Sequence, residues 1–196
     1  MSTEPEYRWP RPPQGGYTAE DLDRLPDLPP HTELIDGSLV LVSPQTAFHD
    51  RVMYLLQSSL LQALPSEVDV YREMTVTLSR RDRPEPDILV VRAEALRDLK
   101  QTTFAPEDVL LAVEVVSPDS EVRDRGIKPA KYAAAGIPHF WRVENVDDRP
   151  VVYVYELDPA PRSYALTGIH HDELKTTVPF DLHIDLTAVR HGRRGA

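Results

Sequence analysis

The stretch from Val109 to Val116 is the feature that most constrains how this chain can fold. It is an almost continuous aliphatic run rich in β-branched residues, which is typical of a central strand covered on both faces. Only Glu114 interrupts the run. Because an unpaired buried carboxylate costs several kcal/mol or must take up a proton, we expect Glu114 to face a cation, a metal ion or a water-filled cleft.

Two more carboxylates lie beside predicted strands. Residues 32–43 contain two β-type runs joined by Asp36-Gly37, a dipeptide favoured in type I′ hairpin turns, and Glu33 lies on the first run. Asp87 directly precedes the apolar run 88–91, where a side chain can reach a cleft while the backbone stays in the sheet. Each residue also has an ordinary explanation, as an exposed edge glutamate and as a turn residue.

Two segments have a helical pattern. The first covers residues 46–64 and places His49 in its first turn, where the helix dipole favours a neutral imidazole. Such a histidine can act as a base or hydrogen-bond partner, and a surface histidine is the alternative. After the central strand, Gly126 and Pro129 interrupt the second helical run. We therefore expect a separate turn or short helix over 121–127 and a helix that ends at Gly136.

The remaining elements are short. We expect a helix opening at Thr18, a connecting helix over 93–99, and strands over residues 68–71, 74–78, 139–143, 151–157, 163–167 and 176–178. Residues 17–189 then form a single domain, between a Pro- and Gly-rich flexible arm at 1–16 and a basic tail at 190–196.

The charge balance limits the choice of partners. With 22 Lys and Arg against 32 Asp and Glu, the net charge is -10 at pH 7, which argues against indiscriminate binding of nucleic acid. A local basic stripe can still bind phosphates, although solvated surface charge is the alternative for each cluster. The candidate stripes are Arg80, Arg81 and Arg83; Arg123, Arg125, Lys128 and Lys131; and Arg190, His191, Arg193 and Arg194.

Composition also bounds the cellular context. The chain has no cysteine, which excludes disulfides and thiolate zinc sites and fits a reducing compartment. No apolar run approaches the roughly 20 residues of a membrane-spanning helix, and the N-terminus has no apolar signal core. We expect a cytoplasmic protein with no membrane partner.

Glu33, Asp87 and Glu114 together suit a hard cation. Carboxylates in this number favour Mg²⁺ or Mn²⁺, which bind carboxylates, waters and substrate phosphate. A nearby lysine, for which Lys128 is the candidate, would neutralise developing negative charge or orient an attacking water.

The ordered motifs resemble the Uma2 family, a branch of the restriction-endonuclease-like PD-(D/E)xK fold, over roughly residues 17–185. The resemblance rests on the segments 33–37 (ELIDG), 86–87 (PD), 114–118 (EVVSP), Asp124 with Lys128 and Tyr132, 135–138 (AGIP) and 140–141 (FW). It implies an α/β fold: a mixed sheet flanked by helices, with an N-terminal β-hairpin.

The resemblance also implies the roles of site residues. Asp87 and Glu114 would bind the metal, the backbone carbonyl of Val115 would complete its coordination, and Glu33 would contribute from the hairpin. Where the general motif has lysine two residues after the glutamate, this chain has Val116. The lysine would then come from the following helix, as Lys128, with Lys131 as the alternative.

The leading hypothesis is a Mg²⁺- or Mn²⁺-dependent endonuclease that cleaves DNA as a homodimer. A protein of the same fold that binds nucleic acid or protein without useful catalysis is the alternative, and a hydrolase of another phosphate ester is a third possibility. The charge layout bears on this choice. Basic residues around the three carboxylates favour a nuclease, whereas a cleft ringed by acids favours the binding protein.

Overall fold

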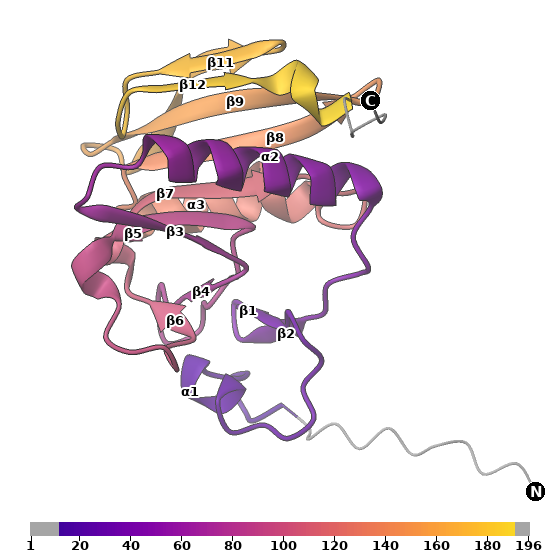
Figure 1. Ribbon diagram of the computed structural model, residues 1–196. Coiled ribbons are helices and arrows are strands. Elements are labelled where there is room, and N and C mark those ends of the chain that lie inside the picture. Colours follow the sequence, from indigo (N-terminus) through magenta and orange to yellow (C-terminus); the bar gives the residue numbers. More distant parts are fainter. Residues whose placement is uncertain (1–11, 191–196) are drawn as a thin grey trace, which may run out of the picture.

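A six-stranded mixed sheet forms the centre of the computed structural model, which describes residues 12–190 (Figure 1). The strand order is β10-β9-β8-β7-β5-β3, and neighbours are antiparallel except for the parallel pair β7 and β8. The six strands are β3 (Val68–Arg72), β5 (Ile88–Arg92), β7 (Val109–Val115), β8 (His139–Val146), β9 (Arg149–Asp158) and β10 (Ser163–His170).

Strand β7 is the buried central strand that the apolar run predicts. It lies between β5 and β8, and Glu114 is among its buried residues. Because two parallel neighbours cannot be joined by a tight turn, the chain must cross over between β7 and β8. The crossover consists of the π-helical turn η3 (Arg123–Ile127) and helix α3 (Lys128–Ala135), so it begins beside the end of the strand that carries Glu114.

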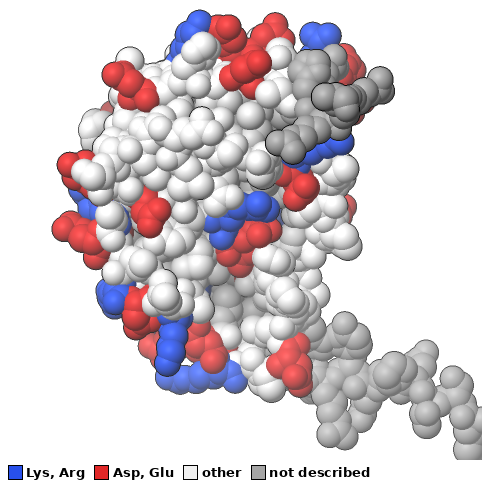
Figure 2. All heavy atoms as spheres, in the orientation of Figure 1, with Lys and Arg blue, Asp and Glu red and all other residues white. Residues whose placement is uncertain are grey.

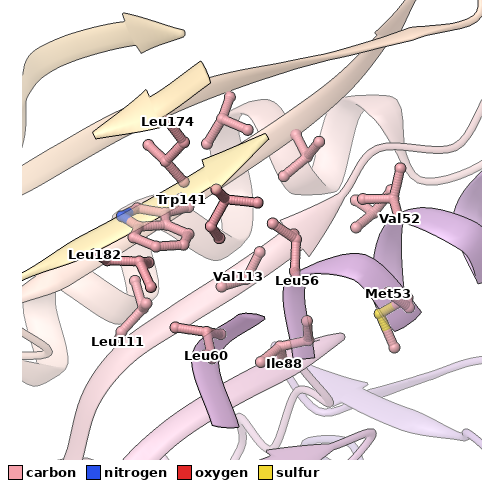
Figure 3. Close-up of a cluster of buried hydrophobic side chains, with 14 of the residues drawn as sticks. Val52, Met53, Leu56, Leu60, Ile88, Leu111, Val113, Trp141, Leu174 and Leu182 are labelled. Carbon is pink, nitrogen blue, oxygen red and sulfur yellow. The ribbon is translucent and has the colours of Figure 1, made fainter. Parts of the chain in front are cut away.

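Helices cover both faces of the sheet. On one face lies α2 (Ala47–Ala63), whose N-cap Thr46 accepts a hydrogen bond from the backbone N–H of His49. Its apolar side packs on the sheet, as Figure 3 shows for Val52, Met53, Leu56, Leu60, Ile88, Leu111, Val113 and Trp141. On the other face, Tyr132 and Ala133 of α3 are buried with Ile137 and Phe140. The sheet is therefore the middle of three layers.

Smaller elements lie at the two ends of the sheet (Figure 1). One group contains the short helix α1 (Ala19–Leu22), the hairpin of β1 (Glu33–Ile35) and β2 (Ser38–Val40), and the pair β4 (Thr75–Val76) and β6 (Thr103–Phe104). Another consists of β11 (Glu173–Thr176), β12 (Leu182–Asp185) and the 3₁₀ turn η4 (Leu186–Arg190), which contact α2 and β9. The remaining 3₁₀ turns are η1 (Ala93–Ala95) and η2 (Pro106–Asp108). In residues 12–190, no helix is long and apolar enough to cross a membrane.

Several local predictions are confirmed. Asp36 and Gly37 have φ angles of 50° and 77°, the positive values that a type I′ hairpin turn requires. Thr18 and Asp21 form the capping box of α1. Gly136 ends α3 in the left-handed conformation at φ 89°.

Other predicted elements were wrong in extent. The helix over 93–99 is only the turn η1, in which Ala95 is buried; residues 97–99 are exposed, with Leu99 at 95%, so no packing supports a longer helix. The strand over 176–178 is absent, since β11 ends at Thr176. There the threonine hydroxyl binds the backbone N–H and carbonyl of Val178, which competes with strand pairing. The strand over 74–78 shortens to β4, whereas β8 and β9 extend to a tight turn at Asp147 and Asp148.

Candidate active site

A cleft of about 320 Å³ brings the predicted site residues together. Its walls include Glu33 from β1, Asp87 immediately before β5, Glu114 and Val115 at the end of β7, and Lys128 at the start of α3. These residues come from four separate segments of the chain. The mixed sheet and its crossover therefore assemble a site from carboxylates that the sequence shows only one at a time.

Lys128 lies among three carboxylates. Its Nζ atom is 2.8 Å from Oε1 of Glu33, 3.1 Å from Oε2 of Glu114 and 3.3 Å from Oδ1 of Asp124. Burial by itself lowers the pKa of Lys128, but these carboxylates outweigh it and hold that pKa well above its ordinary value. The raised pKa favours the charged ammonium form, which contacts all three carboxylates.

The local helix geometry explains how Lys128 and Asp124 share one wall of the cleft. Pro129 has no N–H and cannot donate to the carbonyl of Arg125, so the regular α-helical ladder is interrupted at this point. The backbone N–H of Lys128 instead donates to the carbonyl of Arg123, which is a π-type bond. Single π turns of this kind occur frequently at functional sites.

Both carboxylate oxygens of Glu114 accept hydrogen bonds from protein groups. Its Oε1 atom accepts a 2.6 Å hydrogen bond from the hydroxyl of Tyr132, and Oε2 accepts one from Lys128. Burial raises the pKa of Glu114 well above its ordinary value; Lys128 opposes this, and the neighbouring carboxylates add to it. The expectation that Glu114 faces a cation is confirmed, because Lys128 is that cation.

Asp87 is held from two sides. His49 donates through Nε2 to Oδ1 at 2.9 Å, and the backbone N–H of Val115 donates to Oδ2 at 2.5 Å. His49 is only 4% exposed, so the surface alternative for this residue was wrong and the hydrogen-bonding alternative is confirmed. Val115 thus contacts the site through its N–H, and a role for its carbonyl stays a prediction.

Glu33 is not the exposed edge residue of the ordinary explanation, since it is only 1% exposed. Its Oε1 atom accepts hydrogen bonds from Lys128 and from the backbone N–H of Glu85, at 2.8 Å each. The Glu85 side chain pairs with His31 at the rim of the cleft. This hydrogen bond raises the pKa of His31, while burial raises the pKa of Glu85.

The alternative lysine, Lys131, has a different place. Its Nζ atom lies 2.6 Å from Asp36 and 2.8 Å from Asp82, so it ties α3 to the turn of the β1–β2 hairpin. Arg81 donates to the carbonyl of Asp36, and the buried Arg83 pairs with Asp23. The cluster at 80–83 therefore supports the hairpin instead of lining the cleft. The candidate tail residues 191–196 lie outside the described residues, and the side chain of Arg190 is likewise not described.

Acids dominate the lining of the cleft. Its carboxylates are Glu33, Glu73, Glu85, Asp87, Glu114, Asp119 and Asp124, whereas its cationic side chains are Arg123 and Lys128. On the face of residues 12–190 drawn in Figure 2, basic side chains are scattered among acidic ones and form no continuous band. Because acids ring the cleft, the charge layout favours the binding protein over the nuclease.

The donor set fits a hard divalent cation in its chemistry. Carboxylate oxygens predominate, and Lys128 offsets only part of their charge. No group of three acidic or histidine side chains within residues 12–190 converges closely enough to hold an ion. The oxygens of Asp87 and Glu114 accept hydrogen bonds from protein groups. Metal binding would therefore require some of these hydrogen bonds to be exchanged.

Sequence reasoning left parts of the site unassigned. Asp124 and Tyr132 carried the family resemblance but received no role, and both contact the buried cluster. The spacing of Asp124 and Lys128, four residues apart on a predicted helical segment, is the signal that points to a shared face. Arg123 was noted only as part of a basic stripe, although it lines the cleft.

The mixed sheet, its helical layers and the carboxylate cleft define a restriction-endonuclease-like α/β protein. The chain belongs to the Uma2 family, described as "Putative restriction endonuclease", whose model matches residues 19–188.

The fold is also similar to a crystal structure from Anabaena variabilis titled as a "putative nuclease belonging to DUF820". That likeness has a TM-score of 0.62 and 19% sequence identity, and it covers 88% of this chain and 96% of the other. The search of curated proteins found no match.

Proposed function

We propose that this protein is a Mg²⁺- or Mn²⁺-dependent endonuclease that hydrolyses phosphodiester bonds in DNA. The observation that carries the proposal is that Glu33, Asp87 and Glu114 line one cleft with Lys128, which contacts Glu33 and Glu114, in a chain of a family described as "Putative restriction endonuclease". Asp87 and Glu114 would hold the cation, with Glu33 and the carbonyl of Val115. When bound, such a cation lowers the pKa of water and offsets charge on phosphoryl oxygens.

Lys128 has an electrostatic role in this proposal. The surrounding carboxylates raise its pKa, which favours the charged form and an electrostatic role. Its ammonium group would orient the attacking water and stabilise charge that develops on the phosphoryl group. The water oxygen forms the new bond to phosphorus, its proton leaves to a carboxylate of the cleft or to solvent, and the departing alkoxide takes up a proton.

His49 acts through Asp87. By donating to Oδ1, while the Val115 N–H donates to Oδ2, it fixes the orientation of the Asp87 carboxylate at the wall of the cleft. Partners of this kind commonly change metal affinity by about 10- to 100-fold when they are removed. His49 is therefore a positioning residue in this scheme.

The decisive experiment is cleavage of supercoiled plasmid in the presence of Mg²⁺, Mn²⁺ or EDTA. The native protein is compared with Asp87→Ala and with Asp50→Ala, a matched control that removes an exposed acid outside the cleft. We expect nicking that needs the metal, is lost in Asp87→Ala and persists in Asp50→Ala. Unchanged nicking by Asp87→Ala would overturn the site, and no cleavage of double- or single-stranded DNA by the native protein would overturn the nuclease.

The acidic lining supports a second candidate, a protein that keeps this fold and binds nucleic acid or another protein without cleavage. An excess of buried carboxylates repels phosphate unless cations enter with it. Binding of oligonucleotide without hydrolysis, at every metal tested, would favour this candidate.

Two further expectations belong to the nuclease proposal. Cutting both strands of a duplex requires two active sites, so we propose a homodimer, which light scattering of the purified chain tests. We also propose a cytoplasmic location, where DNA is available as substrate; fractionation of expressing cells tests this.

A further inference from the structure

Arg123 has no acidic ion-pair partner in the described part of the chain. It is the first residue of the π turn η3, and its side chain lines the same cleft as Asp87 and Glu114. Within residues 12–190 its guanidinium group has no ion pair or hydrogen bond, and its Nε atom is buried. A buried N–H donor of a charged group without a partner is costly, so its presence calls for an explanation.

Neighbouring cations are all neutralised. Arg125 pairs with Glu121 and Glu144, and Lys128 and Lys131 each bind two or more carboxylates. Arg123 remains unpaired although acidic side chains line the same cleft. An unpaired guanidinium in an open cleft is a site for an anion that the protein itself does not supply.

The chemistry of the group selects the anion. A guanidinium presents a planar fork of N–H donors that matches two oxygens of a phosphate, and it stays charged at any working pH. A phosphodiester strand presents one such phosphate, with one negative charge, at every nucleotide.

We propose that Arg123 binds a backbone phosphate of the nucleic-acid strand in the cleft and so positions the strand against the Asp87 and Glu114 end. This inference rests on the proposed nuclease function and names the residue that holds its substrate. Arg123 is a substrate-binding group in this scheme, and it contacts neither the attacking water nor the cation.

The test measures binding apart from cleavage. Fluorescence anisotropy of a labelled duplex oligonucleotide, with Ca²⁺ replacing Mg²⁺, is compared for the native chain, Arg123→Ala, Arg123→Lys and Arg125→Ala. We expect Arg123→Ala to raise Kd about tenfold or more and to reduce the slope of log K against log salt by about one. Arg123→Lys restores part of the affinity, because it keeps the charge without the fork.

Arg125→Ala is the matched control. It removes the same charge two residues further along the chain, from an arginine that is already paired with carboxylates. We therefore expect Kd to change by less than about threefold. Because Arg123 has no partner in the described fold, Arg123→Ala should also leave the thermal midpoint unchanged or raise it. Equal Kd values for Arg123→Ala and the native chain, or a native chain that binds no oligonucleotide, would overturn the inference.

These outcomes are distinct from those of the cleavage assay. If the native chain binds DNA through Arg123 but never cuts it, the nuclease proposal would be refuted and the phosphate-binding role of Arg123 would stand. If the native chain cuts DNA and Arg123→Ala binds DNA normally, the phosphate-binding role of Arg123 would be refuted and the nuclease proposal would stand.

Discussion

Lys128 and Glu33 form a buried ion pair, with 2.8 Å between Nζ and Oε1, that joins helix α3 to the β1–β2 hairpin across the cleft. The two side chains are 6% and 2% exposed. The same ammonium group also contacts Glu114 and Asp124, so one cation supports three carboxylates from three elements. Stability and site geometry therefore depend on the same residue.

Replacing Lys128 by methionine should be strongly destabilising. It leaves three buried carboxylates without a cation, and breaking buried pairs in this way typically costs about 3–5 kcal/mol. Urea-induced unfolding measures the loss in unfolding free energy, and the dependence of that free energy on urea concentration is compared between variants. Lys131→Met is the control: Lys131 is 19% exposed, and its partners Asp36 and Asp82 are 71% and 16% exposed, so we expect a smaller loss of about 1 kcal/mol. Similar losses in the two variants would show that Lys128 is not the centre of the buried network.

Replacing His49 by alanine should lower the affinity for the metal more than it lowers the stability of the fold. The variant removes the donor to Asp87 and should raise the Mg²⁺ concentration needed for half-maximal cleavage about 10- to 100-fold. Titration of cleavage rate against Mg²⁺, together with direct Mn²⁺ binding by electron paramagnetic resonance, provides the readout. His49→Gln, which can keep an N–H donor, should recover part of the effect. A Mg²⁺ titration identical to that of the native protein would exclude a positioning role.

Replacing Gly37 by alanine should loosen the hairpin that carries Glu33. Gly37 has φ 77°, and an added Cβ would lie 2.8 Å from the guanidinium nitrogens of Arg81. We expect a loss of about 1–2 kcal/mol from backbone strain, together with reduced cleavage. Thermal unfolding of Gly37→Ala and Gly126→Ala makes the comparison, because an added Cβ at Gly126 meets nothing within 4 Å. A loss no larger for Gly37→Ala than for Gly126→Ala would contradict the strained turn.

The contact between Lys131 and Asp82 should make stability depend on pH in the acid range. Burial by itself raises the pKa of Asp82, but hydrogen bonds from Lys131, the Asp36 N–H and Ser79 outweigh it and lower that pKa overall. A lowered folded-state pKa adds stability above the unfolded value near pH 4, which is lost as pH falls through the folded value.

The difference in unfolding free energy between the native chain and Asp82→Asn should therefore narrow as the pH falls below about 4. Denaturant unfolding at a series of pH values tests this, with the exposed Asp181→Asn as the control. A difference that stays constant with pH would show that the Asp82 carboxylate is not stabilised by its contacts.

Local patterns in the sequence predicted most elements of the fold. The apolar run at Val109–Val116 indicated a strand buried on both faces, which is β7, and Asp36-Gly37 indicated the hairpin turn. Both predictions hold because they depend on residues that are adjacent in the chain, through burial and through permitted φ angles. The short helix over 93–99 failed because helix formation at that length needs tertiary packing, which the segment lacks.

The sequence by itself determined which residue types are available to the site: carboxylates at 33, 87 and 114 beside strands, and lysines on the crossover helix. Only the tertiary structure decided how they are paired. It places Lys128 among the carboxylates and Lys131 on the hairpin turn, joins His49 to Asp87, and leaves Arg123 without a partner in the described residues. The physical reason is that ion pairs and hydrogen bonds depend on distances of a few ångströms between segments far apart in the chain, and strand order and the crossover set those distances.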